Sequence, residues 1–227
     1  MYILHIETST ENCSVALSIG DELVECIDNA EGMNHTAILA PTIQRLLKSA
    51  GIDPSGLGAI SVSSGPGSYT GLRVGSSTAK AMAYSLKIPI VAVPSLSALA
   101  SAAFLGYPDA AWALPMLDAR RNEVYTSLFS RDLEQAIQTS SVILEKQAID
   151  DLIPPGAVVI CCGNWARKLL GHELSQGVII DQEILSSARH LISPAFKLIF
   201  NREFSDPLHF VPYYLKPPNI TQQRKAL

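Results

Sequence analysis

The sequence predicts an α/β protein built from two lobes. Strand and helix signals alternate along its 227 residues, and the second half begins with a hairpin pattern similar to that of the first half. Apolar residues make up 48% of the chain and charged residues 17%, which supplies a packed core and argues against disorder. We therefore expect a first lobe over residues 1–106 and a smaller second lobe over residues 107–227.

The first lobe is predicted to open with three strands. Two apolar runs separated by a polar turn indicate a hairpin, and Gly20 and Asp21 mark the next turn. Apolar residues at helical spacing then predict a helix that closes at Gly51, with Pro41 in its first turn or at a kink. The predicted strands cover residues 2–6, 13–19, 22–27, 59–63 and 90–93, and the predicted helices cover residues 36–50, 70–86 and 95–105.

The second lobe is predicted to repeat the opening hairpin. In residues 3–7 and again in residues 114–118, an apolar strand ends in one carboxylate at a tight turn, which is weak evidence of an internal duplication. The last predicted helix could pack back on the first lobe. The predicted strands cover residues 112–117, 123–129, 157–161 and 178–180, and the predicted helices cover residues 164–170 and 194–204.

The segment 207–227 contains four prolines, three basic residues and no acidic residue. This composition is typical of an extended tail. We expect the tail to be mobile in the free protein and to offer Lys216, Arg224 and Lys225 to a partner or to RNA.

Charge and cysteine content limit the classes of function. The formal net charge is −4, whereas a protein that grips nucleic acid alone usually has a basic surface, so RNA contact would be local or shared with a partner. The four cysteines form no C-x-x-C pair. Neither a secretory leader nor a run of about 20 apolar residues is present, so we expect a cytoplasmic protein with no membrane association.

The most informative segment covers residues 64–83 (SGPGSYTGLRVGSSTAKAMA). A strand leads into a Gly-Pro-Gly turn that opens a helix, so backbone N–H groups could face an anion at the helix N-terminus. The segment is not a P-loop, because Lys80 comes too late. The first hairpin turn, residues 7–10, could also hold a phosphate or metal, and residues 118–123 form the matching turn; the alternative for each is an ordinary solvated hairpin turn. The residues that could face a phosphate are Glu7, Thr8, Ser9, Gly65, Gly67 and Ser68.

Small residues recur at every fourth position of the same segment. They are Gly67, Gly71, Gly75, Ala79 and Ala83. On a helix they form a slanted, nearly flat ridge. Each glycine costs a helix up to about 1 kcal/mol relative to alanine, so we expect close approach of another backbone to offset the cost. That backbone could belong to the protein's own sheet or to a helix of another subunit, and the pattern leaves both open.

Neighbouring residues in the sequence do not build a metal site. The five histidines show neither H-x-x-x-H nor H-E-x-x-H spacing. His5 lies in a predicted buried strand and His35 at a predicted helix start, so we expect structural roles for both.

These residues together resemble the TsaB (YeaZ) family, which serves the bacterial synthesis of threonylcarbamoyladenosine in transfer RNA. The resemblance rests on short strings that run in family order along nearly the whole chain. The strings are I-L-x-I-E-T-S at residues 3–9, C-S-V-A-L at 13–17, His35, G-P-G-S-Y-T-G-L-R-x-G at 65–75, P-S-L at 94–96, D-A-R-x-x-E-V-Y at 118–125 and P-x-Y-L-K at 212–216.

The resemblance implies an actin/hexokinase-like fold of two ribonuclease-H-like lobes. It implies a non-catalytic subunit that binds and activates a related catalytic subunit, TsaD, in forming N6-threonylcarbamoyladenosine at position 37 of tRNA, with a small ATPase, TsaE, as a third component. The chain alone is expected to bind no cofactor, with ATP or ADP held in the complex, and to meet tRNA only through the complex. Without its partner it is expected to form a homodimer.

The resemblance also implies where the contacts lie. The Gly-rich helix and the helix before it are expected to contact the catalytic subunit, and a homodimer would use the same surface. The catalytic relative has a metal-binding H-x-x-x-H where this chain has Ser95 and Leu99, which cannot ligate iron or zinc, so no metal site and no catalytic residue is expected. The expected interface residues are Gly67, Gly71, Arg73, Gly75, Ala79, Ala83 and His35.

The chain departs from the family at two positions. Glu7 stands where the family often has aspartate, and Lys216 stands where it usually has arginine, which loses a bidentate fork. The rival hypothesis is a self-sufficient ATP-dependent enzyme of the same fold, either a small kinase or an ATPase. Such an enzyme needs a catalytic aspartate and a complete phosphate cleft, whereas here the phosphate-facing turns are incomplete and the second lobe is short.

Overall fold

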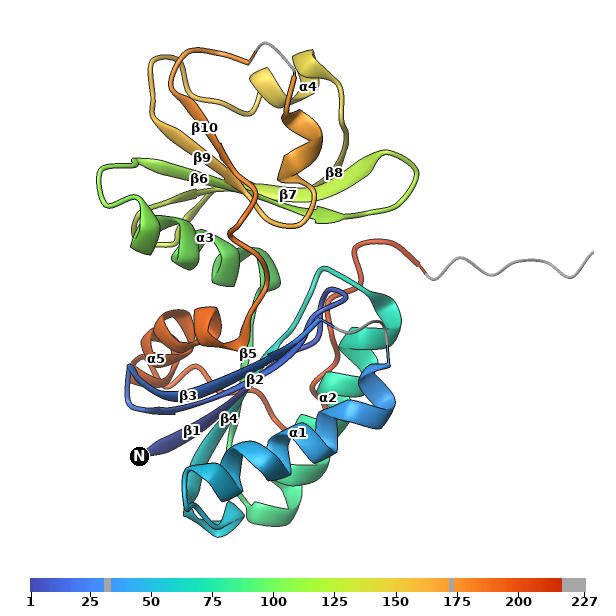
Figure 1. Cartoon of the computed structure of the whole chain (residues 1–227), viewed down its shortest axis with the longest axis vertical. Coiled ribbons are helices and arrows are strands. Elements are labelled where there is room, and N and C mark those ends of the chain that lie inside the picture. The colour runs from blue at the N-terminus through green and yellow to red at the C-terminus, as the bar shows by residue number, and fades with distance from the viewer. Residues whose placement is uncertain (31–33, 172–173, 218–227) are drawn as a thin grey trace, which may run out of the picture.

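Two five-stranded mixed sheets, one in each lobe, organise the chain (Figure 1). The computed structural model describes residues 1–30, 34–171 and 174–217. The strand order is β3-β2-β1-β4-β5 in the first sheet and β8-β7-β6-β9-β10 in the second. In each sheet the first three strands pair antiparallel and the last two join in parallel. The lobes share one topology, which agrees with the repeated hairpin pattern.

The first sheet carries two long helices on one face (Figure 1). Its strands are β1 (Tyr2–Glu7), β2 (Cys13–Ile19), β3 (Glu22–Asn29), β4 (Leu57–Ser63) and β5 (Ile90–Val93). The helices are α1 (His35–Ser49) and α2 (Tyr69–Leu86), and the short 3-10 turn η1 (Pro54–Gly56) precedes β4.

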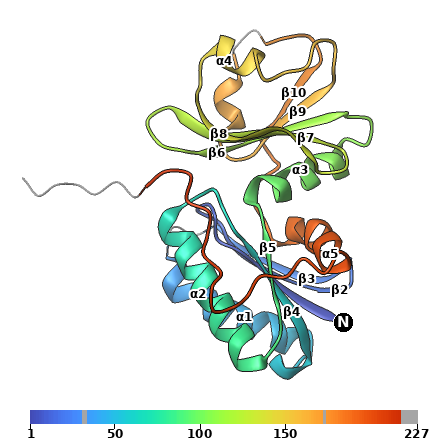
Figure 2. The same cartoon turned by 180° about the vertical axis from the view of Figure 1, so that it is seen from behind.

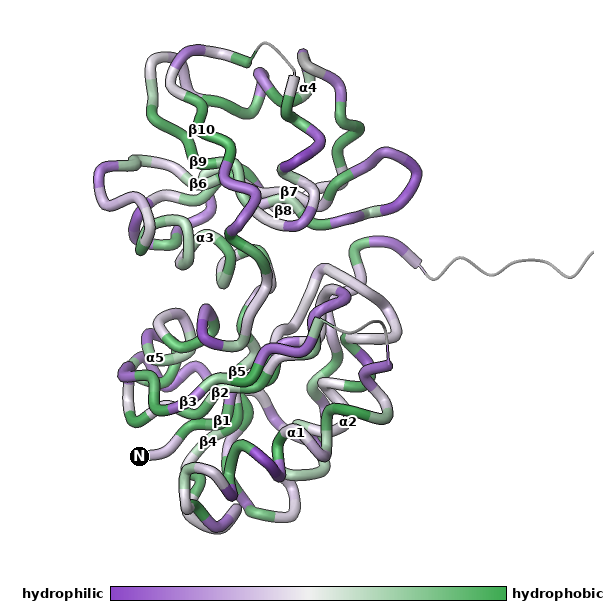
Figure 3. The backbone as a smooth tube through the Cα atoms, viewed as in Figure 1, coloured by the Kyte–Doolittle hydropathy of each residue, from purple (hydrophilic) through white to green (hydrophobic). Residues whose placement is uncertain are grey.

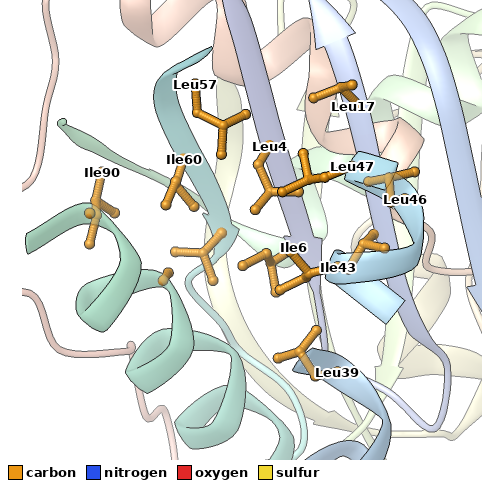
Figure 4. Close-up of a cluster of buried hydrophobic side chains, with 14 of the residues drawn as sticks. Leu4, Ile6, Leu17, Leu39, Ile43, Leu46, Leu47, Leu57, Ile60 and Ile90 are labelled. Carbon is orange, nitrogen blue, oxygen red and sulfur yellow. The ribbon is translucent and has the colours of Figure 1, made fainter. Parts of the chain in front are cut away.

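Helix α1 is amphipathic, and its apolar side forms the core of the first lobe. Leu39, Ile43 and Leu46 recur at helical spacing and are buried. They belong to one cluster with Leu4 and Ile6 of β1 (Figure 4). Each such side chain stabilises the fold by roughly 1.5–3 kcal/mol through burial. Pro41 lies beyond the first turn of α1, on the exposed side of the helix. The helix continues past it to Ser49.

The second sheet packs on the helix that connects the lobes. Its strands are β6 (Trp112–Asp118), β7 (Glu123–Ser130), β8 (Gln135–Ile143), β9 (Val159–Cys162) and β10 (Val178–Asp181), accompanied by α3 (Ser95–Gly106), α4 (Lys146–Asp150) and η2 (Ala166–Leu169). Apolar stretches follow the central strands and α3 (Figure 3). Leu99 and Phe104 of α3 cluster with Leu117 and Phe129 of the sheet. Ala98 of the same helix clusters with Val91 and Val93 of β5, so α3 contacts both lobes and the boundary at residue 106 stays a prediction.

After β10 the chain returns to the first lobe. The 3-10 turn η3 (Ala188–Leu191) and helix α5 (Ile192–Phe200) lie on the face of the first sheet opposite α1 and α2 (Figures 1 and 2). Leu191 and Ala195 are buried there against Val91 and Val93 of β5. The first lobe is therefore completed by residues 188–200, far along the chain from its first strands.

Residues 205–217, which we call the strap, then cross the first lobe to the space between the lobes (Figure 2). The Ser205 N–H donates to the Ile90 carbonyl at 2.9 Å. The Lys80 ammonium donates to the Phe210 carbonyl at 2.9 Å. The expectation of a mobile tail is therefore wrong up to residue 217, because main-chain and side-chain contacts hold the strap. Arg224 and Lys225 lie outside the described residues.

The main differences between the sequence prediction and the structure lie at β8, η2 and α5, and helix α4 was also not predicted. Strand β8 was not expected, because its sequence, QAIQTSSVI, lacks apolar alternation, and pairing with β7 determines it instead. The predicted helix 164–170 is only the 3-10 turn η2. The predicted helix 194–204 begins at Ile192 and ends at Phe200, followed by Arg202 in the left-handed region with φ of 61°.

Candidate functional site

A cleft of about 510 Å³ opens between the two lobes. Both hairpin turns, the N-terminal ends of α1 and α2 and the end of the strap line it. The residues that matter below are Ser9, His35, Gly67, Ser68, Tyr69, Asp118, Arg120, Tyr125, Tyr214 and Lys216. No helix in the part of the chain that the structure describes combines the length and apolar character needed to cross a membrane.

The first hairpin turn faces inward more than the sequence suggested. Glu7 is buried, and its carboxylate accepts a hydrogen bond from the Ser9 N–H at 2.5 Å. Burial raises the pKa of Glu7, although hydrogen bonds from Ser9 and neighbouring groups oppose the shift. Of the three candidate residues in this turn, only Ser9 lines the cleft. Glu7 and Thr8 are therefore not placed to face a phosphate.

The space beside the Gly-Pro-Gly turn is filled by other main-chain segments of the protein. A Cβ atom at Gly67 would overlap with the main-chain oxygen of Ser9, and one at Gly65 would overlap with that of Tyr213. The Gly65 N–H donates to Ser95 Oγ at 3.1 Å, and the Ser68 N–H donates to the Ser9 carbonyl at 2.6 Å. These two N–H groups of the predicted phosphate cradle already have partners. Gly67 and Ser68 line the cleft, whereas Gly65 does not.

The ridge of small residues packs inside the protein. Gly71, Gly75, Ala79 and Ala83 are buried on the side of α2 that faces the first sheet. A Cβ atom at Gly71 would overlap with the main-chain oxygen of Thr8, and one at Gly75 would overlap with Thr8 Oγ1. The close backbone is therefore that of the first hairpin turn. The expectation that this ridge is exposed for another subunit is wrong, because the protein's own turn fills the space.

The opposite side of α2 and the neighbouring side of α1 form an exposed surface, which we call the α1–α2 face. Its residues are Ala37, Ala40, Pro41, Gln44, Lys48, Arg73, Ser77, Ala81 and Tyr84. Two of the nine, Lys48 and Arg73, carry a charge, and most of the other side chains are small. Arg73 is the one expected interface residue that lies on this face. His35, also expected there, is buried at the first position of α1.

His35 and Ser9 present unpartnered polar atoms next to the cleft. His35 Nε2 and Ser9 Oγ are buried and have no hydrogen-bond partner among the residues that the structure describes, and both residues line the cleft. Ser68 caps α2 by accepting a hydrogen bond from the Gly71 N–H at 3.3 Å. This end of the cleft is therefore polar and is built by two helix N-termini.

The second hairpin turn joins β6 to β7 and contains three consecutive residues with positive φ. Arg120, Arg121 and Asn122 all lie in the left-handed region, with φ of 69°, 52° and 62°. The Asp118 carboxylate accepts from the Arg120 N–H at 2.7 Å, which braces the turn. Glu123 follows, and it bonds the strap at Lys216. Three consecutive left-handed residues could not be predicted from the sequence, because none of them is glycine.

The strap adds cleft residues that the site prediction missed. Tyr214 and Lys216 line the cleft together with Tyr125 of β7. Burial raises the pKa values of both tyrosines. The available signal was the pair of strings D-A-R-x-x-E-V-Y and P-x-Y-L-K, whose acid and base could have been paired by charge. Among the described residues, no three His, Cys, Asp or Glu side chains gather as a metal site.

Comparison with known proteins gives a consistent result. The family model described as tRNA N6-adenosine threonylcarbamoyltransferase matches residues 30–156. The tRNA threonylcarbamoyladenosine biosynthesis protein TsaB of Escherichia coli is 35% identical over 95% of both chains. Its counterpart in Bacillus subtilis is 38% identical over 63% of both chains. The structure of YeaZ from Pseudomonas aeruginosa aligns with a TM-score of 0.79 at 27% identity, covering 94% of this chain and 99% of that one.

Two ribonuclease-H-like lobes that face each other across a cleft make this an actin/hexokinase-like protein. The strand order, the family strings and the alignments over nearly the whole chain agree. The chain belongs to the TsaB (YeaZ) family of tRNA threonylcarbamoyladenosine biosynthesis proteins, which confirms the resemblance seen in the sequence.

Proposed function

We propose that this protein is the non-catalytic subunit that binds and activates a TsaD-type threonylcarbamoyltransferase as it forms N6-threonylcarbamoyladenosine at position 37 of tRNA. The observation that carries the proposal is family membership over 95% of the chain. The match to the threonylcarbamoyltransferase family model supports common descent with the catalytic partner. Because the two chains have related lobes, they carry related surfaces, and a complex of the two would resemble a homodimer.

The two positions that replace the catalytic histidines support a non-catalytic role. Ser95 Oγ accepts a hydrogen bond from the Gly65 N–H at 3.1 Å, and Leu99 is buried in the core of the second lobe. Neither residue supplies an imidazole for a metal. We therefore propose that the isolated chain neither holds a metal nor turns over a substrate.

The remaining assignments follow from the same proposal. The N–H groups of Gly65 and Ser68 are bonded within the chain, which supports the proposal that the chain alone binds no nucleotide. ATP or ADP would be held in the complex, with a TsaE-like ATPase as third component. We propose a homodimer when the partner is absent, contact with tRNA only through the complex, and a cytoplasmic location.

We propose that the partner contact uses the α1–α2 face instead of the buried ridge. This face is exposed, has no acidic residue among those named above and is rich in small side chains, so another helix pair could approach closely. Tyr84, which is 66% exposed, would supply an aromatic anchor, and Arg73 a directional donor. A homodimer on the same face would compete with the catalytic partner.

Co-purification with the TsaD-type and TsaE-type proteins, followed by a tRNA modification assay, tests the proposal. Ala81→Arg places a long charged side chain on the α1–α2 face, and Ala111→Arg makes the same change on an exposed site of the second lobe. We expect Ala81→Arg to weaken partner binding roughly 5- to 100-fold and Ala111→Arg to have no effect.

Two results would contradict the proposal. Equal partner binding by the two variants would remove the α1–α2 face as the contact. ATP turnover near 1 per second by the isolated chain, typical of a slow enzyme, would favour the rival hypothesis of a self-sufficient enzyme.

A further inference from the structure

The strap contacts both lobes at its end. The Tyr213 N–H donates to the Ser64 carbonyl of the first lobe at 2.7 Å. Leu215 packs against the core of the second lobe. The Lys216 ammonium then reaches Glu123 Oε2 at 2.6 Å. Within four residues, the strap thus passes from one lobe to the other.

Lys216 occupies a socket made by the string D-A-R-x-x-E-V-Y. Its ammonium lies 2.6 Å from Glu123 Oε2, 3.5 Å from the Ala119 carbonyl oxygen and 5.9 Å from the centre of the Tyr125 ring. Glu123 also accepts from Ser141 Oγ at 2.5 Å, which orients the carboxylate. The hydrogen bond from Lys216 is the main cause of the lowered pKa of Glu123. The string therefore forms a receptor for the strap, a role that the proposed function does not require.

The strap also contacts the first turn of α2. The Tyr214 ring lies 4.8 Å from the ring of Tyr69, centre to centre, at a tilt of 42°. Arg73 donates to the Tyr69 hydroxyl at 3.0 Å, and its guanidinium lies 5.5 Å from the centre of the same ring. Arg73 belongs to the α1–α2 face. A continuous series of contacts thus connects that face with Glu123 in the second lobe.

We propose that the strap is an inter-lobe latch in which Lys216 is the positioning residue, and that closure of the latch is coupled to partner binding at the α1–α2 face. Tyr214 is held between the anchored Tyr213 and the anchored Lys216. When Lys216 leaves its socket, Tyr214 loses one anchor, and Tyr69 and Arg73 lose a neighbour that orders them. The partner then meets a less ordered surface and binds less tightly. The coupling half of this proposal rests on the proposed function.

Amide hydrogen exchange on the isolated chain tests the latch itself. Lys216→Met removes the charge and keeps the apolar stem, whereas Lys216→Arg keeps the charge. Lys168→Met is a matched control, because the Lys168 ammonium lies 3.7 Å from the centre of the Trp165 ring, a contact within the second lobe. Lys216→Met removes an ion pair and a ring contact. We therefore expect the Tyr213 amide to exchange roughly 3- to 10-fold faster in this variant than in the wild type.

We expect near wild-type exchange of that amide in Lys216→Arg and in Lys168→Met. Unchanged protection of the Tyr213 amide in Lys216→Met would overturn the latch. Equal loss in Lys216→Met and Lys168→Met would also overturn it, because the effect would then be a general loss of charge.

Titration of the full-length variants with the TsaD-type partner tests the coupling. We expect Lys216→Met to bind roughly 3- to 10-fold more weakly and the other two variants to bind as the wild type does. By reciprocity, saturating partner should slow exchange of the wild-type Tyr213 amide by a similar factor. Faster exchange with unchanged affinity would overturn the coupling. If the wild type fails to bind the partner at all, the proposed function fails, while the exchange experiment still decides the latch.

Discussion

Replacing Gly75 by alanine should destabilise the protein, because the added methyl group would overlap with Thr8 Oγ1. Overpacking of this kind costs about 1–3 kcal/mol. Alanine in place of glycine stabilises a helix by up to about 1 kcal/mol, which offsets part of the loss. We therefore expect the free energy of unfolding to fall by about 1–2 kcal/mol.

A second substitution shows whether Thr8 is the obstacle. Thr8→Ala removes the hydroxyl that meets Gly75, and within the described part of the chain that buried hydroxyl has no hydrogen-bond partner. In this background Gly75→Ala should be neutral or stabilising by up to about 1 kcal/mol. Gly71→Ala is the matched control, because its methyl group would overlap with the main-chain oxygen of Thr8, which no side-chain change removes. Its cost should persist in both backgrounds.

Urea denaturation followed by far-ultraviolet circular dichroism measures these differences. Both tryptophans, Trp112 and Trp165, lie in the second lobe, so their fluorescence reports separately on the lobe that is not altered. If Gly75→Ala lowered the free energy of unfolding equally in the wild-type and Thr8→Ala backgrounds, the reasoning would be refuted. A variant of full stability that had lost partner binding would instead mean that the ridge faces the partner.

Three further predictions concern buried titratable groups. Burial lowers the pKa of His5 from 6.5 to about 3, so the unfolded chain takes up a proton that the folded chain does not as the pH falls below 6.5. His5 should therefore account for a loss of about 2 kcal/mol of unfolding free energy between pH 7 and pH 5, and His5→Gln should remove this part of the wild-type slope in urea titrations; parallel slopes of the two proteins would contradict this. Burial raises the pKa of Glu7, so stability present at low pH is lost as the pH rises from 4.5, where the unfolded chain ionises, through the folded pKa. The free energy of unfolding of Glu7→Gln should therefore rise relative to that of the wild type between pH 4 and pH 7. A difference between the two proteins that stays constant over this range would contradict the raised pKa of Glu7. Only Cys26 should react rapidly with dithiobis(nitrobenzoate) in the native protein, because the other three cysteines are buried with raised pKa values; rapid reaction of a second thiol would show that one of them is accessible.

The sequence predicted those elements whose apolar pattern is local. The bounds of β2 and β5 agree with the structure to the residue, because continuous apolar runs between turn residues leave little choice. The two hairpins led correctly to two lobes of one topology. Strand β8 escaped prediction because its polar sequence becomes a strand only by pairing with β7.

The candidate site was harder to predict, because its contacts join distant parts of the chain. A ridge of small residues indicates close approach of a backbone but does not identify that backbone, and here it is Thr8. The contact of Lys216 with Glu123 spans 93 positions, so it depends on how both lobes fold. Ser9 and Ser68 were predicted to face a ligand and do line the cleft, whereas Glu7 turns inward because burial of β1 continues to its end.

The return of α5 to the first lobe has a consequence for synthesis of the protein. When residues 1–106 have left the ribosome, the side of β5 that Leu191 and Ala195 later cover is still bare. At 5–20 residues per second, translation of the next hundred or so residues takes roughly 5–20 s. Through that interval the nascent first sheet exposes apolar strands to water and to neighbouring chains. A fragment that ends at residue 106 should therefore aggregate or recruit chaperones, and the earliest-made lobe is the last to be finished.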